Sequence, residues 1–287
     1  MHKPMAHGNG GNAALSALRE CSLATVLAYG HHVAADYEYE IIVDGNYLGI
    51  IHASPNYLDD AVAGLLLREG EARLGDHVVI EHVELVGPLR YRVRARRVEA
   101  VSASLPRDGT VEWDTVQIIY RDFVSRIPKK VCPYALHTIA VYMLGQAERI
   151  ERLLVVSDAS RHSAALKVAG ALSRLASEGK LEGLQLVAVS TGRISADAVT
   201  ALSAAGVWII ISNHHPLLSG LVEALKRGVT LVLRRPDGVG LAVYTSSWRV
   251  KNAPTIELEL SASTPGVGEV ERAAPQRVRG RVAAPTC

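Results

Sequence analysis

Val207-Trp208-Ile209-Ile210-Ile211, with the polar segment 212–216 directly after it, is the clearest guide to the architecture of this chain. It is a short, continuously apolar run, and similar runs occupy residues 152–156, 184–189 and 229–233. Patterns of helical periodicity separate these runs, at 161–177, 195–205 and 217–227. Continuous hydrophobicity predicts strands covered on both faces, and helical crossovers make neighbouring strands parallel. We therefore predict a three-layer α/β domain.

One further strand is expected at the end of this series. Residues 241–245 form another apolar run, and the turn tripeptide Pro236-Asp237-Gly238 precedes it. So short a connection joins antiparallel strands. The sheet is therefore predicted to be mixed but mainly parallel.

The first half of the chain has a different rhythm. Strand-like runs at 37–43 and 47–52 flank Asp44-Gly45-Asn46, whose Asp-Gly pair suits the tight turn of a hairpin. Helical spacing follows at 57–69 and ends at Gly70. Further strands are predicted at 77–86, 91–101 and 115–124. Together these elements predict a smaller α+β domain with a mostly antiparallel sheet.

These patterns divide the chain into four parts. Residues 1–22 are expected to form a loosely held N-terminal segment, and residues 251–287 a C-terminal tail. Between them, we assign 23–130 to the α+β domain and 131–250 to the α/β domain.

Composition narrows the class of protein. The chain has 287 residues, 48% of them hydrophobic, and a net charge of +2, which is typical of a soluble globular protein and gives no sign of nucleic-acid binding. We found no membrane-spanning run and no secretory leader, so a cytoplasmic location is expected. The three cysteines, Cys21, Cys132 and Cys287, form no Cys-x-x-Cys pair. No structural metal is therefore predicted.

Polar clusters follow the predicted parallel strands. They comprise 157–162 with Asp158, Arg161 and His162, 190–195 with Thr191 and Gly192, and 212–216. Ligands of such sheets bind beyond the carboxyl ends of the strands, so these clusters should face one crevice. Arg193 and a helix N-terminus capped by Ser195 would suit a phosphate there. Arg234 and Arg235, just before Pro236-Asp237-Gly238, could hold a second phosphate.

Each of these features also has a simpler explanation. Gly192-Arg193 could merely turn the chain, and Asp158 could merely pair with Arg161. His162 could cap or pack, and the two arginines at 234 and 235 could lie on a solvated sheet edge. Adjacent histidines at 214 and 215 have no carboxylate or cysteine at metal-ligand spacing.

Taken in order, the motifs resemble those of the FdhD family of formate dehydrogenase accessory sulfurtransferases. The resemblance spans roughly residues 37–250 and includes Asp158-Ala159-Ser160-Arg161-His162-Ser163-Ala164, with Lys167 and Gly170 following in step. Thr191-Gly192-Arg193-Ile194-Ser195 resembles the family's Ser-Gly-Arg-x-Ser. In the first half, the matching motifs are Glu40 to Gly45, Ala53 to Asp60, Ala63-Gly64 and Glu69-Gly70.

This resemblance implies a cytidine-deaminase-like α/β domain and a homodimer. It implies a pocket for molybdopterin guanine dinucleotide, for which GDP is a mimic, with a contacting loop near residues 234–238. The implied reaction is a sulfur relay, in which a cysteine takes persulfide sulfur from a cysteine desulfurase and passes it to the cofactor of formate dehydrogenase. That step requires a thiolate.

The chain departs from the family where the sulfur chemistry should lie. The family's Cys-Gly-x-Cys-Gly and Thr-Gly-Gly-x-His are compressed here into residues 130–137, which keep Cys132 as the candidate sulfur carrier and His137 for the family's histidine. One cysteine and the glycines are missing, so the alternative is a cofactor-binding module without sulfur transfer. A zinc deaminase would need His-x-Glu and Pro-Cys-x-x-Cys, and neither occurs.

Overall fold

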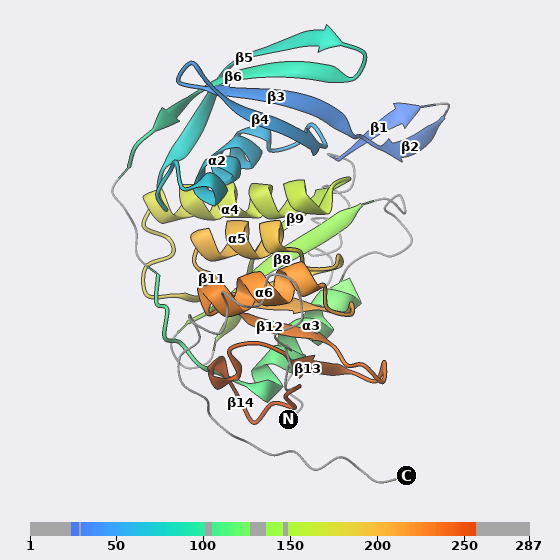
Figure 1. Cartoon of the computed structure of the whole chain (residues 1–287), viewed down its shortest axis with the longest axis vertical. Coiled ribbons are helices and arrows are strands. Elements are labelled where there is room, and N and C mark those ends of the chain that lie inside the picture. Colours follow the sequence, from blue (N-terminus) through green and yellow to red (C-terminus); the bar gives the residue numbers. More distant parts are fainter. Residues whose placement is uncertain (1–23, 29, 101–104, 127–135, 146–148, 257–287) are drawn as a thin grey trace, which may run out of the picture.

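The structure is a computed structural model that describes residues 24–28, 30–100, 105–126, 136–145 and 149–256. Its two larger sheets, of four and six strands, have helices between them (Figure 1). Within the described residues, no helix is both long and apolar enough to cross a membrane.

The first half builds a four-stranded sheet in the order β4-β3-β6-β5. Its strands are β3 (Tyr37–Val43), β4 (Asn46–Ala53), β5 (His77–Gly87) and β6 (Arg90–Val98). The predicted β3–β4 hairpin is confirmed, and Asp44 and Gly45 take φ values of 50° and 81°, as its tight turn requires. The β3–β6 pair is parallel and the other pairs are antiparallel. A small hairpin of β1 (Thr25–Ala28) and β2 (His31–Ala34) precedes this sheet.

One face of this sheet is covered by α2 (Leu58–Glu69), which ends at Gly70 as predicted. The strands alternate so that Tyr39, Ile41 and Val93 point toward the helix and are buried. The opposite face carries charged residues, among them Glu40 and Arg92, which form an ion pair.

The second half forms a six-stranded sheet in the order β13-β12-β11-β10-β8-β9. Its strands are β8 (His137–Leu144), β9 (Ile150–Asp158), β10 (Gln185–Ser190), β11 (Val207–Ser212), β12 (Thr230–Arg234) and β13 (Leu241–Val243). The helices α4 (Arg161–Ser177), α5 (Ala196–Ala204) and α6 (Leu218–Arg227) connect β9 through β12. The β10–β11 and β11–β12 pairs are parallel, and β13 closes the predicted antiparallel hairpin.

One strand of this sheet was not predicted. β8 lies between β9 and β10 and is antiparallel to both, so the run at 152–156 does not pair with the next run along the chain. Because β8 runs the opposite way, its first residue, His137, lies at the edge where β9 and β10 end. The reversed direction of β8 thus brings His137 beside Asp158, the last residue of β9.

The strand predicted at 115–124 is wrong, because these residues belong to the helix α3 (Trp113–Arg126). Its buried residues, Val116, Ile119 and Phe123, follow the i, i+3, i+7 spacing of a helix face. They pack on the face of the six-stranded sheet opposite α4, through Val187 and Ile209. The predicted three-layer arrangement is thus present, with α3 as its third layer.

The two halves meet at a close crossing of α2 and α4. A Cβ atom added to Gly64 would lie 1.9 Å from the Leu166 carbonyl oxygen, and one added to Gly170 would lie 1.9 Å from that of Asp60. Glycine is therefore required at both positions for the helices to approach this closely.

Short segments also join the early and late parts of the chain. β7 (Val111–Glu112) pairs in parallel with β14 (Val250–Lys251), which follows the 3₁₀ turn Ser247–Arg249. At the end of the described chain, the Ile256 amide donates to the Val243 carbonyl.

Candidate functional site

A cavity of about 620 Å³ lies where β9 and β10 end and β8 begins. Its lining comes from four chain segments, namely 136–137, 159–162, 191–193 and His214. Three of the polar clusters predicted to share a crevice therefore do contribute to one cavity.

Arg161 and His162 enter the cavity from the first turn of α4. Ser160 caps this helix, and its hydroxyl accepts from the Ser163 amide at 3.4 Å. The His162 ring lies beside Asp197, with 3.7 Å between Nε2 and Oδ2. The helix dipole adds partial positive charge at this wall of the cavity.

The turn after β10 is held from both sides. The Thr138 amide donates to the Thr191 hydroxyl at 2.8 Å, and the Ser212 hydroxyl donates to the Gly192 carbonyl at 2.7 Å. A Cβ atom on Gly192 would come within 3.3 Å of His137 Nδ1 and 3.5 Å of Arg161 Cβ. The missing side chain thus lets His137 and Arg161 lie against the turn.

Arg193 and His214 complete the cavity on its exposed side. The His214 Nε2 atom lies 2.6 Å from the Thr191 carbonyl oxygen, so this nitrogen carries the proton and donates it. The sequence placed His214 in a loop facing the crevice but gave no reason to select it from its neighbour His215. The bond to Thr191 supplies that reason.

The cavity is electropositive. No acidic residue lines it, and no carboxylate in the described part of the chain forms an ion pair with Arg161 or Arg193. Burial lowers the pKa of His137, and the charge of Arg161 lowers it further. Burial and Arg161 likewise lower the pKa of His162, against the opposing effect of Asp197. Both rings are therefore mainly neutral at pH 7, and the two guanidiniums carry the charge.

Asp158 does not line the cavity but lies beneath it, with no exposed surface. Its partner is Lys167 rather than Arg161, with 2.5 Å between Oδ2 and Nζ. Burial raises the pKa of Asp158, and Lys167 opposes that rise. The sequence placed Lys167 in the family motif but gave it no role, since a lysine inside a helix is ordinarily solvated.

Several other predicted residues also lie outside the cavity lining. Ser195 is the residue before α5, but its buried hydroxyl has no hydrogen-bond partner among the described residues and does not cap the helix. The Arg234 guanidinium donates to the Gly238 carbonyl, and Arg235 pairs with Asp237 at 2.7 Å. Both arginine side chains of the turn 234–238, which includes Pro236, therefore interact with other residues of the same turn. It lies next to the site only through the Arg234 amide, which donates to the His214 carbonyl.

Cys132, the predicted sulfur carrier, lies outside the described residues, as do Cys21 and Cys287. Within the described ranges, no three His, Cys, Asp or Glu side chains are grouped as metal ligands.

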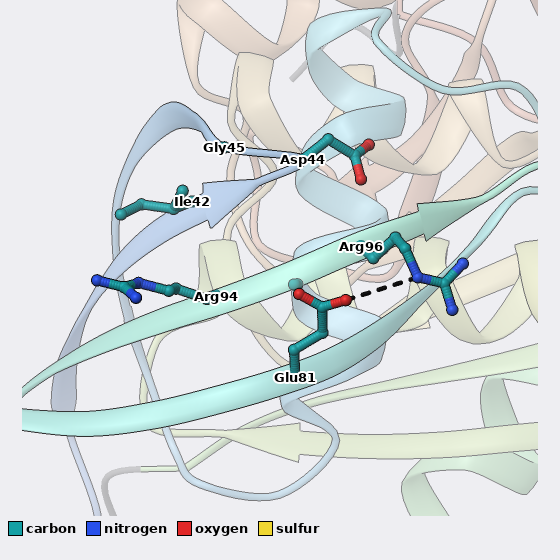
Figure 2. Close-up of a pocket in the computed structure, with 7 residues that line it drawn as sticks. Ile42, Asp44, Gly45, Glu81, Arg94 and Arg96 are labelled. Atoms are coloured by element: carbon teal, nitrogen blue, oxygen red, sulfur yellow. Dashed lines mark ion pairs between the residues drawn. The ribbon is translucent and has the colours of Figure 1, made fainter.

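A second hollow, of about 560 Å³, lies on the four-stranded sheet, where it is lined by residues of β3, β5, β6 and the β3–β4 turn. Figure 2 shows the Glu81–Arg96 ion pair across it, with 3.6 Å between the charged atoms. Arg94 has no ion-pair partner in the part of the chain that is described. The charged side chains that line this hollow are exposed.

Comparisons with known proteins agree on one family. The model of the FdhD/NarQ family matches residues 129–251. The sulfur carrier protein FdhD of Methanothermobacter thermautotrophicus is 26% identical over 222 residues, which cover 70% of this chain and 84% of that protein. A solved structure from Desulfotalea psychrophila, provisionally described as a formate dehydrogenase accessory protein, aligns with a TM-score of 0.54 and 22% identity. That alignment covers 79% of this chain and 96% of the other, and it supports a shared mixed α/β fold.

Proposed function

We propose that this chain is a member of the FdhD/NarQ family, whose model matches residues 129–251, and that it is a sulfur carrier for formate dehydrogenase maturation. In this proposal it works in the cytoplasm, as a homodimer, between a cysteine desulfurase and formate dehydrogenase. Its cargo is molybdopterin guanine dinucleotide, whose phosphates bind in the cavity at the strand ends.

The observation that carries the binding step is that Arg161 and Arg193 line one cavity to which the described residues contribute no acidic side chain. Guanidiniums recognise phosphate through paired hydrogen bonds, and the N-terminus of α4 adds favourable charge. A volume of about 620 Å³ lies within the range that small-molecule sites occupy. These features fit the nucleotide part of the cargo.

The sulfur step is assigned to Cys132 by the family resemblance. Four residues separate it in the sequence from His137 in the cavity lining, and a chain segment of that length spans at most about 18 Å. A thiol on this tether could deliver sulfur to a cargo held by Arg161 and Arg193. The Cys132 thiolate attacks the outer sulfur of the desulfurase persulfide and releases the desulfurase cysteine as a thiolate, so that Cys132 carries the sulfur as a persulfide.

A second candidate function is binding without sulfur transfer. It is favoured by one observation, that Cys132 is the only cysteine between residues 22 and 286, where the family motif has two. Such a protein would hold the cofactor and protect it until the enzyme takes it up.

Titration with GDP tests the binding step. We expect saturable binding of one GDP per chain, weakened at least about tenfold by Arg161→Ala through loss of a charged hydrogen bond. Absence of GDP binding by the unaltered protein would contradict both candidate functions.

Persulfide labelling by a desulfurase separates the two. If sulfur is carried, Cys132→Ala abolishes labelling, whereas Cys21→Ala, the matched control, keeps it. GDP binding without any labelling would favour the second function.

A further inference from the structure

The Lys167–Asp158 ion pair is buried completely, since neither side chain has exposed surface. Taking two charges out of water is costly, and a buried pair is kept only where further hydrogen bonds satisfy it. Its hydrogen bonds therefore indicate what the pair holds in place.

On one side, the pair holds the segment that leads into α2. Lys167 Nζ donates to the Ser54 carbonyl and to Asn56 Oδ1, both at 2.9 Å. The Ser54 amide donates to Asp158 Oδ2 at 3.1 Å. The Asn56 amide group donates in turn to the Ser157 carbonyl.

On the other side, the pair holds the turn that lines the cavity. The Ser160 amide donates to Asp158 Oδ1 at 2.7 Å, and the Ala159 amide donates to the Ser54 hydroxyl at 3.0 Å. Ala159 and Ser160 both line the cavity, and Arg161 follows directly. One carboxylate thus bonds the cavity turn with one oxygen and the N-terminal half with the other.

We propose that Lys167 and Asp158 are positioning residues, which fix the 159–162 turn so that Arg161 meets the phosphate. This inference rests on the proposed function for its ligand, but the positioning itself concerns the protein alone. Neither residue touches the ligand in this proposal.

The test compares Lys167→Met with Arg174→Met. Arg174 lies on the same helix and also pairs with the N-terminal half, through Asp60 at 3.2 Å, but it does not contact the cavity turn. We expect Lys167→Met to raise the Kd for GDP by about tenfold or more, while Arg174→Met leaves it within about twofold. Equal losses in the two variants would overturn the proposal.

A double variant separates positioning from folding. Lys167→Met leaves a buried carboxylate unpaired, and adding Asp158→Asn removes that charge but supplies only one acceptor oxygen. We expect the double variant to regain melting temperature relative to Lys167→Met while GDP binding stays weak. Recovery of binding in step with melting temperature would show a purely structural role.

Amide hydrogen exchange without ligand gives a readout that does not depend on GDP. Lys167→Met should speed exchange at Ala159 and Ser160 by about tenfold, with no such change in Arg174→Met. If the unaltered protein binds no GDP, the proposed function fails. The exchange rates then still show whether Lys167 and Asp158 fix the 159–162 turn. Unchanged exchange at both amides would overturn it.

Discussion

Two hollows of similar size differ in what lies beneath them. The cavity at the strand ends, about 620 Å³, is built from turns anchored by buried hydrogen bonds, including those of Asp158 and Ser212. The hollow on the four-stranded sheet, about 560 Å³, is lined by exposed charged side chains on regular strands. Volume alone does not distinguish them.

The difference lies in preorganisation. A ligand that meets fixed groups loses little free energy in ordering them, whereas flexible surface arginines must be immobilised on binding. The sheet hollow also has Glu81 opposite Arg96, which already neutralises part of its charge. Of the two hollows, the strand-end cavity is the one in which guanidiniums without ion-pair partners lie on turns that buried hydrogen bonds hold in place.

The largest effect is expected from a substitution that disrupts the close crossing of α2 and α4. Gly170→Ala would place a methyl group 1.9 Å from the Asp60 carbonyl oxygen, and two helix backbones would have to separate. We expect a loss of about 3 kcal/mol in the free energy of unfolding, measured by urea denaturation. Gly145→Ala is the control, because nothing lies within 4 Å of its added Cβ. Equal stability of the two variants would refute the close crossing of α2 and α4.

The next effect compares the two hollows directly. Arg193→Ala should weaken GDP binding by about 1.5–3 kcal/mol, or about 10- to 150-fold in Kd, because a charged hydrogen bond is lost. Arg94→Ala, which removes a guanidinium from the sheet hollow, should leave the Kd unchanged. Calorimetric titration measures both, and the reverse result would place the anion site on the sheet.

A smaller effect concerns pH. The pKa values of His137 and His162 lie below the usual 6.5 in the folded protein, so the unfolded chain binds more protons as pH falls through that value. Stability without ligand should therefore decrease below pH 6.5. The affinity for GDP should instead increase as the pH falls, because each imidazolium adds positive charge to the cavity.

GDP itself titrates in this range, so the measurement needs a reference. Subtracting the profile of His137→Asn/His162→Asn removes the ligand's contribution and leaves that of the two rings. A difference profile that is flat from pH 7 to pH 5 would exclude them from the binding site.

The smallest effect is expected on the sheet. Glu81 and Arg96 are both more than half exposed, so Glu81→Gln should change the free energy of unfolding by less than about 0.5 kcal/mol. Thermal melts at low and high salt would measure it. A loss above about 2 kcal/mol would mean that the sheet hollow is as firmly built as the cavity.

Local chemistry made much of the fold predictable. The Asp44-Gly45 turn, the helix that ends at Gly70 and the α4, α5 and α6 helices follow from turn residues and periodicity. The meeting of Arg161, Thr191 and Arg193 followed from a rule about where parallel strands end.

The errors arose where long-range pairing decides structure. Residues 115–124 are rich in β-branched and aromatic residues, and that composition obscured the helical spacing of Val116, Ile119 and Phe123. β8 was missed although residues 139–144 form an apolar run that Gly145 follows, and its position between β9 and β10 depends on pairing with residues distant in the chain. The Asp158–Lys167 pair could not be predicted, since its partners, Ser54 and Asn56, lie more than a hundred residues away.

The helix α3 has a practical consequence for dissecting this protein. The segment that matches the family model begins at residue 129, after α3 has ended. A fragment that begins there would expose Val187, Val189 and Ile209, which form the apolar face of the six-stranded sheet that α3 covers. Truncations meant to isolate the six-stranded sheet should therefore start before residue 111, since an exposed apolar face of this kind favours aggregation.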